Sequence, residues 1–440
     1  MKIRFYKISV LVFLVLSLAA CRKESLVAED TNPNQRICKT YLDQFEAVWQ
    51  GMNQGYTFWG VDTVDWDERY AKYQPIFAAF DSRSYVSEYE YQSAYEGLFE
   101  GLVDHHLMGI FYSPKGRMTA YVSPGRNDYF HTTSAFFERQ KELEALQDRR
   151  DLVYYCGCDP EDYGSFSIPG TYFALLKGKT ADQRIAYFRF TNFYLNNIYH
   201  YKDIIPNSVS AQAALRAFYG PRYWEGITTG AGYANNDSVM GIIIDLRGNG
   251  GGSTGDLGPF IASLSQGANM VGYTRVKDGI GRLDYSPWSP YTIYAPSNRL
   301  NKEKPIVVLS DINSVSCAEL ATMLIKNLPN GTFIGERTYG AIGALLPQSE
   351  QCHDYFYSGC MGYYELYENG SDYFRYKDIF PYYIYTSTFH MVDKDYQPVE
   401  GVGVQPDYEI LFNRDRLVND GKDIQLENAI YFIKNGRVIN

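Results

Sequence analysis

Residues 305–343 read PIVVLSDINSVSCAELATMLIKNLPNGTFIGERTYGAIG. The apolar run 306–309 is typical of a buried strand, and the polar residues 311–314 predict a turn after it. From Cys317 onward apolar residues recur at helical spacing, so Ser316 is predicted where the strand turns into a helix. A helix N-terminus offers backbone N–H groups and a positive dipole end to an oxyanion, although a serine at this place most often only caps the helix.

A second informative run is GIIIDLRGNGGG at residues 241–252. Three consecutive isoleucines, Ile242 to Ile244, are typical of a strand that is covered on both faces. The glycines that follow allow a backbone to approach a ligand closely. Their spacing fits neither the dinucleotide-binding nor the P-loop motif. We interpret the run as a candidate anion or oxyanion pocket, with a tight strand connection as the alternative.

The first 35 of the 440 residues have the pattern of an exported lipoprotein. Lys2, Arg4 and Lys7 precede an apolar run at 8–20, which is too short to span a bilayer and ends in Leu-Ala-Ala-Cys. The pattern resembles a bacterial lipoprotein signal, with residues 1–20 as signal peptide, Cys21 as the acylated residue and 21–35 as tether. An ordinary secretory peptide is the alternative. We expect a lipid-anchored protein of the bacterial cell envelope, at the outer membrane.

The charge and the cysteines exclude some partners. Removing residues 1–20, which hold three basic residues and no acid, changes the net charge from −10 to −13. An acidic chain argues against nucleic acid as a partner, since phosphate contacts need clustered Lys and Arg. Cys317 is predicted to be a buried helix residue, and Cys352 and Cys360 could form a disulfide. None of the cysteines has the spacing of a metal site, so neither metal nor cofactor is expected.

Apolar periodicity divides the rest of the chain. Residues 36–110 predict a helical domain with helices around 37–48, 66–77 and 95–102, and Pro75 is expected to kink or end the second. Residues 111–180 predict loops and short strands. Residues 181–440 predict a core with the following elements: a strand at 185–190, a helix at 211–218, antiparallel aromatic strands at 355–367 and 373–385, a loop at 400–407 and a last helix at 426–433.

Four segments, in this order, resemble peptidase family S41, which includes the C-terminal processing and tricorn-type proteases. They are GLVDHH at 101–106, DLRGNGGG at 245–252, SCAE at 316–319 with GERTYG at 335–340, and EGVGVQPD at 400–407. The resemblance covers most of residues 36–435. It implies an α/β fold: a ClpP/crotonase-like αβ core, an N-terminal helical domain and an aromatic-rich antiparallel β segment. It also implies that Ser316, and not Ser314, is the nucleophile.

The resemblance also bears on the catalytic base. The processing proteases carry a lysine 25 residues after the serine, where this chain has Ala341, so a Ser/Lys dyad is excluded. The tricorn-type branch uses histidine and glutamate at positions that match His106 and Glu400, with His105 as an alternative base. Ser316 would attack a carbonyl, His106 would transfer the proton and Glu400 would orient the imidazole.

The resemblance further implies an oxyanion site formed by backbone N–H groups of Cys317 and of Gly251 or Gly252. Between His106 and Ile185 no Gly-Leu-Gly-like loop occurs, so a PDZ domain is expected to be absent or degenerate at 111–180. The implied function is a lipid-anchored serine endopeptidase acting on peptides or unfolded proteins. The alternatives are an inactive S41-fold lipoprotein that binds peptides or hydrophobic ligands and, from the 41 tyrosines alone, a glycan-binding surface protein.

Overall fold

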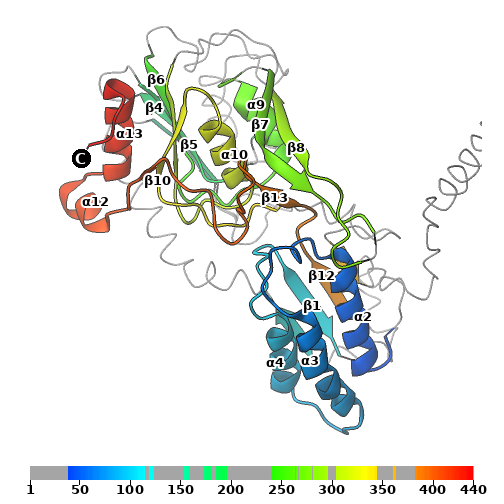
Figure 1. Ribbon diagram of the computed structural model, residues 1–440. Helices are drawn as coiled ribbons and strands as arrows, with labels where there is room; N and C mark the ends of the chain where they lie inside the picture. Colours follow the sequence, from blue (N-terminus) through cyan, green and yellow to red (C-terminus); the bar gives the residue numbers. More distant parts are fainter. Residues whose placement is uncertain are drawn as a thin grey trace, which may run out of the picture.

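The computed structural model describes residues 38–113, 118–122, 153–158, 173–179, 185–193, 195, 239–262, 264–265, 267–279, 281–295, 304–343, 360–362 and 382–439. They form two regions, an αβ core and a smaller region of helices on a sheet (Figure 1). The predicted α/β class and the helical N-terminal region are confirmed. The predicted signal peptide and tether at 1–35, the predicted helix at 211–218 and Cys352 lie outside the described residues. No described helix has the length and apolarity needed to cross a membrane.

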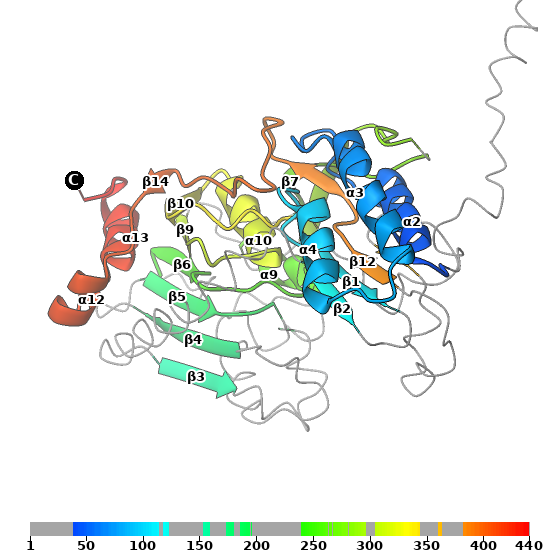
Figure 2. The same cartoon turned by 90° about the horizontal axis from the view of Figure 1, so that it is seen from below.

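A mixed seven-stranded sheet forms the centre of the core. Its strand order is β14-β10-β9-β6-β5-β4-β3. The strands from β14 to β5 run parallel, and β4 and β3 extend the sheet in antiparallel fashion at one edge (Figure 2). The strands are β3 (Val153–Cys158), β4 (Phe173–Lys179), β5 (Ile185–Phe190), β6 (Gly241–Asp245), β9 (Ile306–Ser310), β10 (Gly331–Gly335) and β14 (Tyr408–Glu409).

Both faces of this sheet are covered, which explains the uninterrupted apolar runs. Ile242 and Ile244 of β6 point into the larger core, which also contains α9 (Leu257–Ala262) and α10 (Cys317–Lys326). Ile243 points to the opposite face, under α13 (Ile424–Asn435). β9 alternates in the same way. Because neighbouring residues of a strand face opposite sides, a strand between two helical layers must be apolar at every position.

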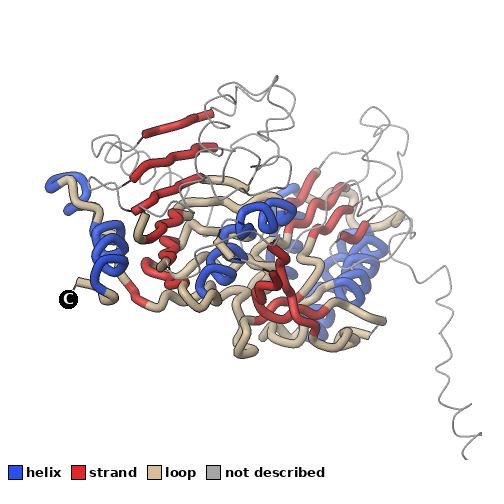
Figure 3. Tube along the Cα trace, turned by 90° about the horizontal axis from the view of Figure 1, so that it is seen from above, coloured by secondary structure: helices blue, strands red, loops and turns tan. Residues whose placement is uncertain are grey.

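The remaining core elements are two short helices and a second sheet, whose strand β7 contacts α10. The short 3-10 helix η7 (Thr254–Asp256) precedes α9, and α12 (Arg414–Asp420) precedes α13. A three-stranded antiparallel sheet has the order β13-β7-β8, from β7 (Gly267–Arg275), β8 (Ser289–Ala295) and β13 (His390–Val392). Seen from above, the C-terminal and N-terminal helices lie at opposite ends of the molecule, with the sheets between them (Figure 3).

The N-terminal region consists of α2 (Tyr41–Gly55), α3 (Trp66–Asp81) and α4 (Glu88–Phe99) on a four-stranded sheet. The sheet has the order β11-β12-β1-β2, from β11 (Cys360–Gly362), β12 (Tyr382–Tyr385), β1 (Met108–Tyr112) and β2 (Thr119–Val122). The predicted antiparallel pairing of the aromatic segments is confirmed for β11 and β12. α3 continues past Pro75 to Asp81, and Phe77 and Phe80 beyond the proline are buried.

Tyr382 and Ile384 of β12 are buried in the same apolar cluster as the three N-terminal helices. The core of the N-terminal region is therefore completed by a strand from the C-terminal half of the chain.

The connection between β7 and β8 contacts the N-terminal helices. Arg282 donates two hydrogen bonds to the carboxylate of Asp67, at 2.6 and 3.1 Å, and one to Asn53 Oδ1 at 2.8 Å. Nearby, the guanidinium of Arg275 lies 4.0 Å from the ring centre of Tyr285 and 4.6 Å from that of Trp288. These contacts join the two regions on the side of the β7–β8 hairpin.

Candidate active site

Ser316 lies at the N-terminus of α10, where the sequence predicted a strand-to-helix turn. Its φ of 57° and ψ of −119° are unfavourable for a residue with a side chain, and it is one of two such non-glycine residues in the described part of the chain. A backbone of this kind costs about 1–3 kcal/mol and persists only where its surroundings impose it. Strained positions of this type are concentrated at active sites.

The loop between β9 and α10 is held by buried side chains. Asp311 accepts hydrogen bonds from the backbone N–H groups of Gly248 and Asn313, at 2.9 and 3.0 Å. The Ser314 hydroxyl donates to the Leu246 carbonyl at 2.8 Å and accepts from the Asp311 N–H at 3.0 Å. Ser314 is thus a buried structural residue, which agrees with the choice of Ser316 as the candidate nucleophile.

The glycine turn after β6 packs directly against Ser316. A Cβ on Gly251 would lie 2.7 Å from both the Cβ of Ser316 and the carbonyl oxygen of Val315, and φ at Gly251 is +89°. Only glycine is compatible with this approach. The N–H of Gly251 donates to Asn249 Oδ1 at 2.9 Å, and the N–H of Val315 donates to the Asn249 carbonyl at 2.9 Å. The predicted anion pocket and the predicted nucleophile therefore lie side by side.

Glu319 is a buried carboxylate on the first turn of α10. It accepts the backbone N–H of Ser316 at 3.0 Å, the hydroxyl of Thr338 at 2.6 Å and the N–H groups of Gly340 and Ala341 at 2.7 and 2.8 Å. Burial raises the pKa of Glu319 to about 7, and these donors oppose the increase. Glu319 thus fixes Ser316 to the turn that carries Ala341.

Glu400, which is also buried, binds the next two residues of that turn. Its carboxylate accepts the backbone N–H groups of Ile342 and Gly343 at 2.9 and 3.0 Å, and that of His105 at 3.0 Å. Burial raises the pKa of Glu400 well above its usual range, and the nearby charge of Asp104 raises it further. Glu400 therefore connects the turn at 340–343 to the predicted histidine segment.

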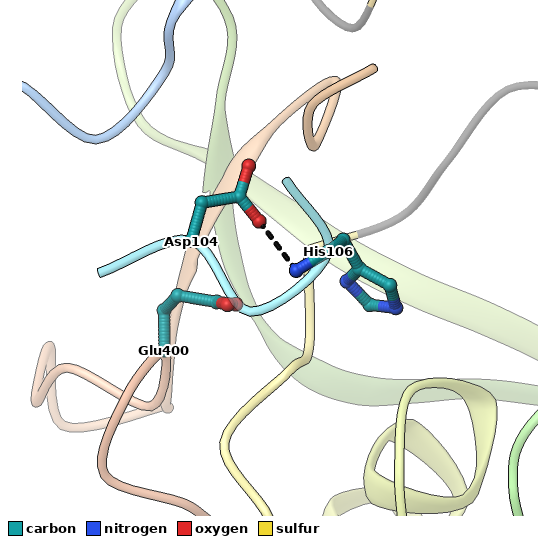
Figure 4. A group of neighbouring side chains, drawn as sticks. All are labelled: Asp104, His106 and Glu400. Carbon is teal, nitrogen blue, oxygen red and sulfur yellow. Dashed lines mark hydrogen bonds between the residues drawn. The ribbon is translucent and has the colours of Figure 1, made fainter. Parts of the chain in front are cut away.

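His106 is buried in the loop between α4 and β1. One ligand atom each of His106, Asp104 and Glu400 lie within 4.8 Å of one another. Figure 4 shows both carboxylates on one side of the His106 backbone and the imidazole extending from the other side. His105 is half-buried, and its ring lies 4.8 Å from that of Tyr339.

Asp104, His106 and Glu400 are also of the types that bind transition metals. Each carboxylate, however, already accepts three hydrogen bonds from backbone or hydroxyl groups. The imidazole extends away from both (Figure 4). The arrangement fits proton transfer at His106 better than coordination of a cation.

A comparison with protein families gives a clear result. Residues 224–410 match the model of peptidase family S41. This part of the chain, residues 224–410, belongs to peptidase family S41. The S41 chain is accordingly a serine-type peptidase, and the segments 245–252, 316–319, 335–340 and 400–407 all lie inside the matched range. No match was found among curated proteins.

Solved structures agree with the fold of the S41 chain. A candidate peptidase from Parabacteroides merdae ATCC 43184 is 20% identical and superposes with a TM-score of 0.56, over 91% of this chain and 99% of that one. Mature CPAF is 13% identical, with a TM-score of 0.52 over 91% of this chain and 99% of that one. At such identities the similarity concerns the fold.

Sequence reasoning did not single out three residues of this site. Glu319 has a recognisable signal, because Ser-x-x-Glu before an apolar run is the pattern of a capping box. Asp104 stands two residues before His106, a spacing at which a side chain can accept a backbone N–H. Ser387 has no local signal, since its contact with Asp104 joins residues 283 positions apart.

Proposed function

We propose that this S41 chain is a lipid-anchored serine endopeptidase that hydrolyses peptides or unfolded proteins in the bacterial cell envelope. Ser316 is the nucleophile and His106 is the general base. Glu400 is the carboxylate that orients the histidine segment and places a negative charge beside it. The reaction proceeds through an acyl-enzyme at Ser316.

The observation that carries this proposal is the turn at 340–343. Two buried glutamates bind its backbone: Glu319, which also holds the Ser316 N–H, and Glu400, which also holds the His105 N–H. The place of the processing-protease lysine, Ala341, thus lies between the nucleophile segment and the histidine segment. Its methyl group packs with Val315 and Tyr339 and can take no proton.

The hydrogen bonds also bear on the oxyanion site. The Gly251 N–H is occupied by Asn249 Oδ1. The N–H groups of Gly252 and of Cys317 have no hydrogen-bond partner among the described residues. We therefore favour Gly252 and Cys317 as the donors to the oxyanion, with Gly251 as the close-packed spacer between Ser316 and the turn.

The nucleophile is tested by labelling with a fluorophosphonate probe. The wild-type protein should be labelled, Ser316→Ala should not, and Ser314→Thr, which keeps a hydroxyl at the structural serine, should be labelled. Labelling of Ser316→Ala at the wild-type rate would falsify the assignment.

The base is tested by peptide hydrolysis. His106→Ala should lose at least about 100-fold in kcat/KM, because general base catalysis contributes 10²–10⁴-fold. His105→Ala should retain most of the activity, since its ring packs on Tyr339. The opposite result would assign the base to His105.

Anchoring at Cys21 is a separate part of the proposal, supported by the signal pattern at 1–21. Cells fed a radioactive or clickable fatty acid should incorporate it into the wild-type protein and not into Cys21→Ser. Equal incorporation would contradict lipidation at this residue. The alternative, an inactive binding module, would be favoured if the wild-type protein neither reacted with the probe nor cleaved any member of a broad peptide library, but bound peptides.

A further inference from the structure

We propose that Asp104 is a second acidic group of this site: it positions the histidine segment and adds a negative charge beside His106, so that the protonated imidazole is stabilised by two carboxylates. This inference rests on the proposed function, since it concerns the same histidine. Asp104 lies inside the segment GLVDHH at 101–106, but the motif gave it no role.

The geometry of Asp104 is that of a positioning residue. Its carboxylate is fully buried and accepts the backbone N–H of His106 at 2.8 Å. It also accepts the N–H and the hydroxyl of Ser387, at 2.9 and 3.0 Å. Ser387 follows β12, so Asp104 joins the loop of the base to the strand from the C-terminal half. A rotation of this loop would break these three hydrogen bonds.

Several ionisable groups face this segment and have to be counted. Glu400 accepts the His105 N–H, and Asp62 accepts the Val103 N–H at 2.9 Å. Tyr56 donates its hydroxyl to Asp62 at 2.8 Å and accepts the Asp104 N–H at 3.2 Å. Burial raises the pKa of Tyr56 well above its usual range, so it is neutral.

Glu319 binds the 340–343 turn rather than the histidine segment. Its negative charge also raises the pKa of Glu400. The acids nearest to the imidazole are therefore Asp104 and Glu400, whose carboxylates are within 4.8 Å of a ring nitrogen and of each other.

Two buried acids at this distance cannot both be ionised at low cost unless a positive charge lies beside them. The proton that His106 takes from Ser316 supplies this charge. Transition-state formation thus adds a positive charge within 4.8 Å of two like negative charges, which makes the pair of acids less unfavourable. Since Asp104 is held by Ser387 and the His106 N–H, its charge stays in place while the substrate reacts.

The test is an NMR titration of the imidazole of His106 in the full-length protein, compared with that of Asp104→Asn. Removing one negative charge should lower the pKa of His106 by about one pH unit. Ser387→Ala is the matched control, because it removes a hydrogen bond to Asp104 and keeps the charge; it should leave the titration unchanged. If Asp104→Asn titrates like the wild type, Asp104 is only structural and the inference is wrong.

A second variant covers the case that Asp104→Asn does not fold. In Glu400→Gln the charge of Asp104 remains, so His106 should still titrate at or above the value of an ordinary histidine. A buried imidazole without an acid would titrate below it, and that result would overturn the inference.

If the enzyme is active, the decrease of kcat/KM at low pH should shift in Asp104→Asn by the same amount as the pKa of His106 measured by NMR. The NMR titration itself needs no turnover. A wild-type protein without activity would therefore contradict the proposed function and still allow this test.

Discussion

The two halves of the candidate site are built in different ways. The nucleophile side, residues 241–252 and 306–319, consists of two parallel strands, β6 and β9, each followed by a turn that leads to a helix. The histidine side, residues 101–106 with Ser387 and Glu400, has no regular structure of its own. It is held by carboxylates that accept backbone N–H groups from remote parts of the chain.

This difference has a physical consequence. On the nucleophile side apolar burial in β6, β9 and α10 fixes the backbone, and glycine permits the close approach. On the histidine side each carboxylate replaces water for three donors, so removing one carboxylate leaves several buried N–H groups unsatisfied. Added side-chain volume should therefore disrupt the nucleophile side. Changes of charge and pH should instead affect the histidine side and Glu319, which joins Ser316 to the 340–343 turn.

The largest effect is expected from Gly251→Ala. The new methyl group would lie within 2.7 Å of Ser316 Cβ and the Val315 carbonyl, at a φ of +89°. The variant should lose peptide hydrolysis by at least about 100-fold, because the overlap displaces Ser316 from the oxyanion donors and the loss of one such donor costs about this much. It should also be destabilised by about 3 kcal/mol or more, from the strained backbone and the overlap together. Urea unfolding and kcat/KM are the measurements.

Gly267→Ala is the matched control. Gly267 has a φ of +69°, but nothing lies within 4 Å of an added Cβ. It should lose only about 1–2 kcal/mol, the cost of the left-handed backbone, and keep its activity. Equal effects of the two substitutions would show that the contact with Ser316 is unimportant.

An intermediate effect is expected from Glu319→Gln, and it should depend on pH. The folded protein holds a proton on Glu319 up to a pKa of about 7, against 4.5 for an exposed glutamate, so between these values the native state binds more protons than the unfolded state. The stability of the wild type relative to the variant should therefore be greatest below pH 4.5 and decrease by up to about 3 kcal/mol as the pH rises to 7.

Denaturant unfolding of both proteins at pH 5 and at pH 8 measures this change. Glu100→Gln, at an exposed glutamate whose side chain is 76% accessible, should show no such dependence. A constant difference between wild type and Glu319→Gln across this range would mean that Glu319 is ionised throughout.

The smallest effect is expected from Asp67→Asn, which breaks the ion pair with Arg282 between the two regions. The Asp67 side chain is 69% exposed, so its loss should cost less than about 1 kcal/mol and leave kcat/KM unchanged. Thermal unfolding at low and high salt measures it. A large loss of activity would show that this surface contact, rather than the buried carboxylates, sets the position of the histidine side.

The nucleophile side could be predicted from the sequence because its determinants are local. The run Ile242–Ile244 predicted a strand covered on both faces and the run Ile306–Leu309 a buried strand, and both predictions are confirmed. The spacing after Cys317 predicted α10, and Cys317 is buried in it. Helical periodicity likewise located α2, α3 and α13.

The histidine side was accessible only through the resemblance to family S41. The partners of Glu400 are backbone N–H groups, and such groups carry no sequence signal. Pro75 shows a related limit. The local rule predicted that the helix would kink or end there, but α3 continues to Asp81, and Phe77 and Phe80 beyond the proline are buried. The roles of Ser316, His106 and Glu400 remain predictions that the experiments above address.

One consequence concerns the order in which the molecule can fold. β12 fills the core of the N-terminal helices, yet it stands some 280 residues after α4 in a chain that is synthesised from its N-terminus. Contacts so distant in sequence form late. Ser387, which follows β12, also holds Asp104 beside His106. We therefore expect the nascent protein to stay inactive until nearly all of the chain, including β12 and Ser387, has been synthesised.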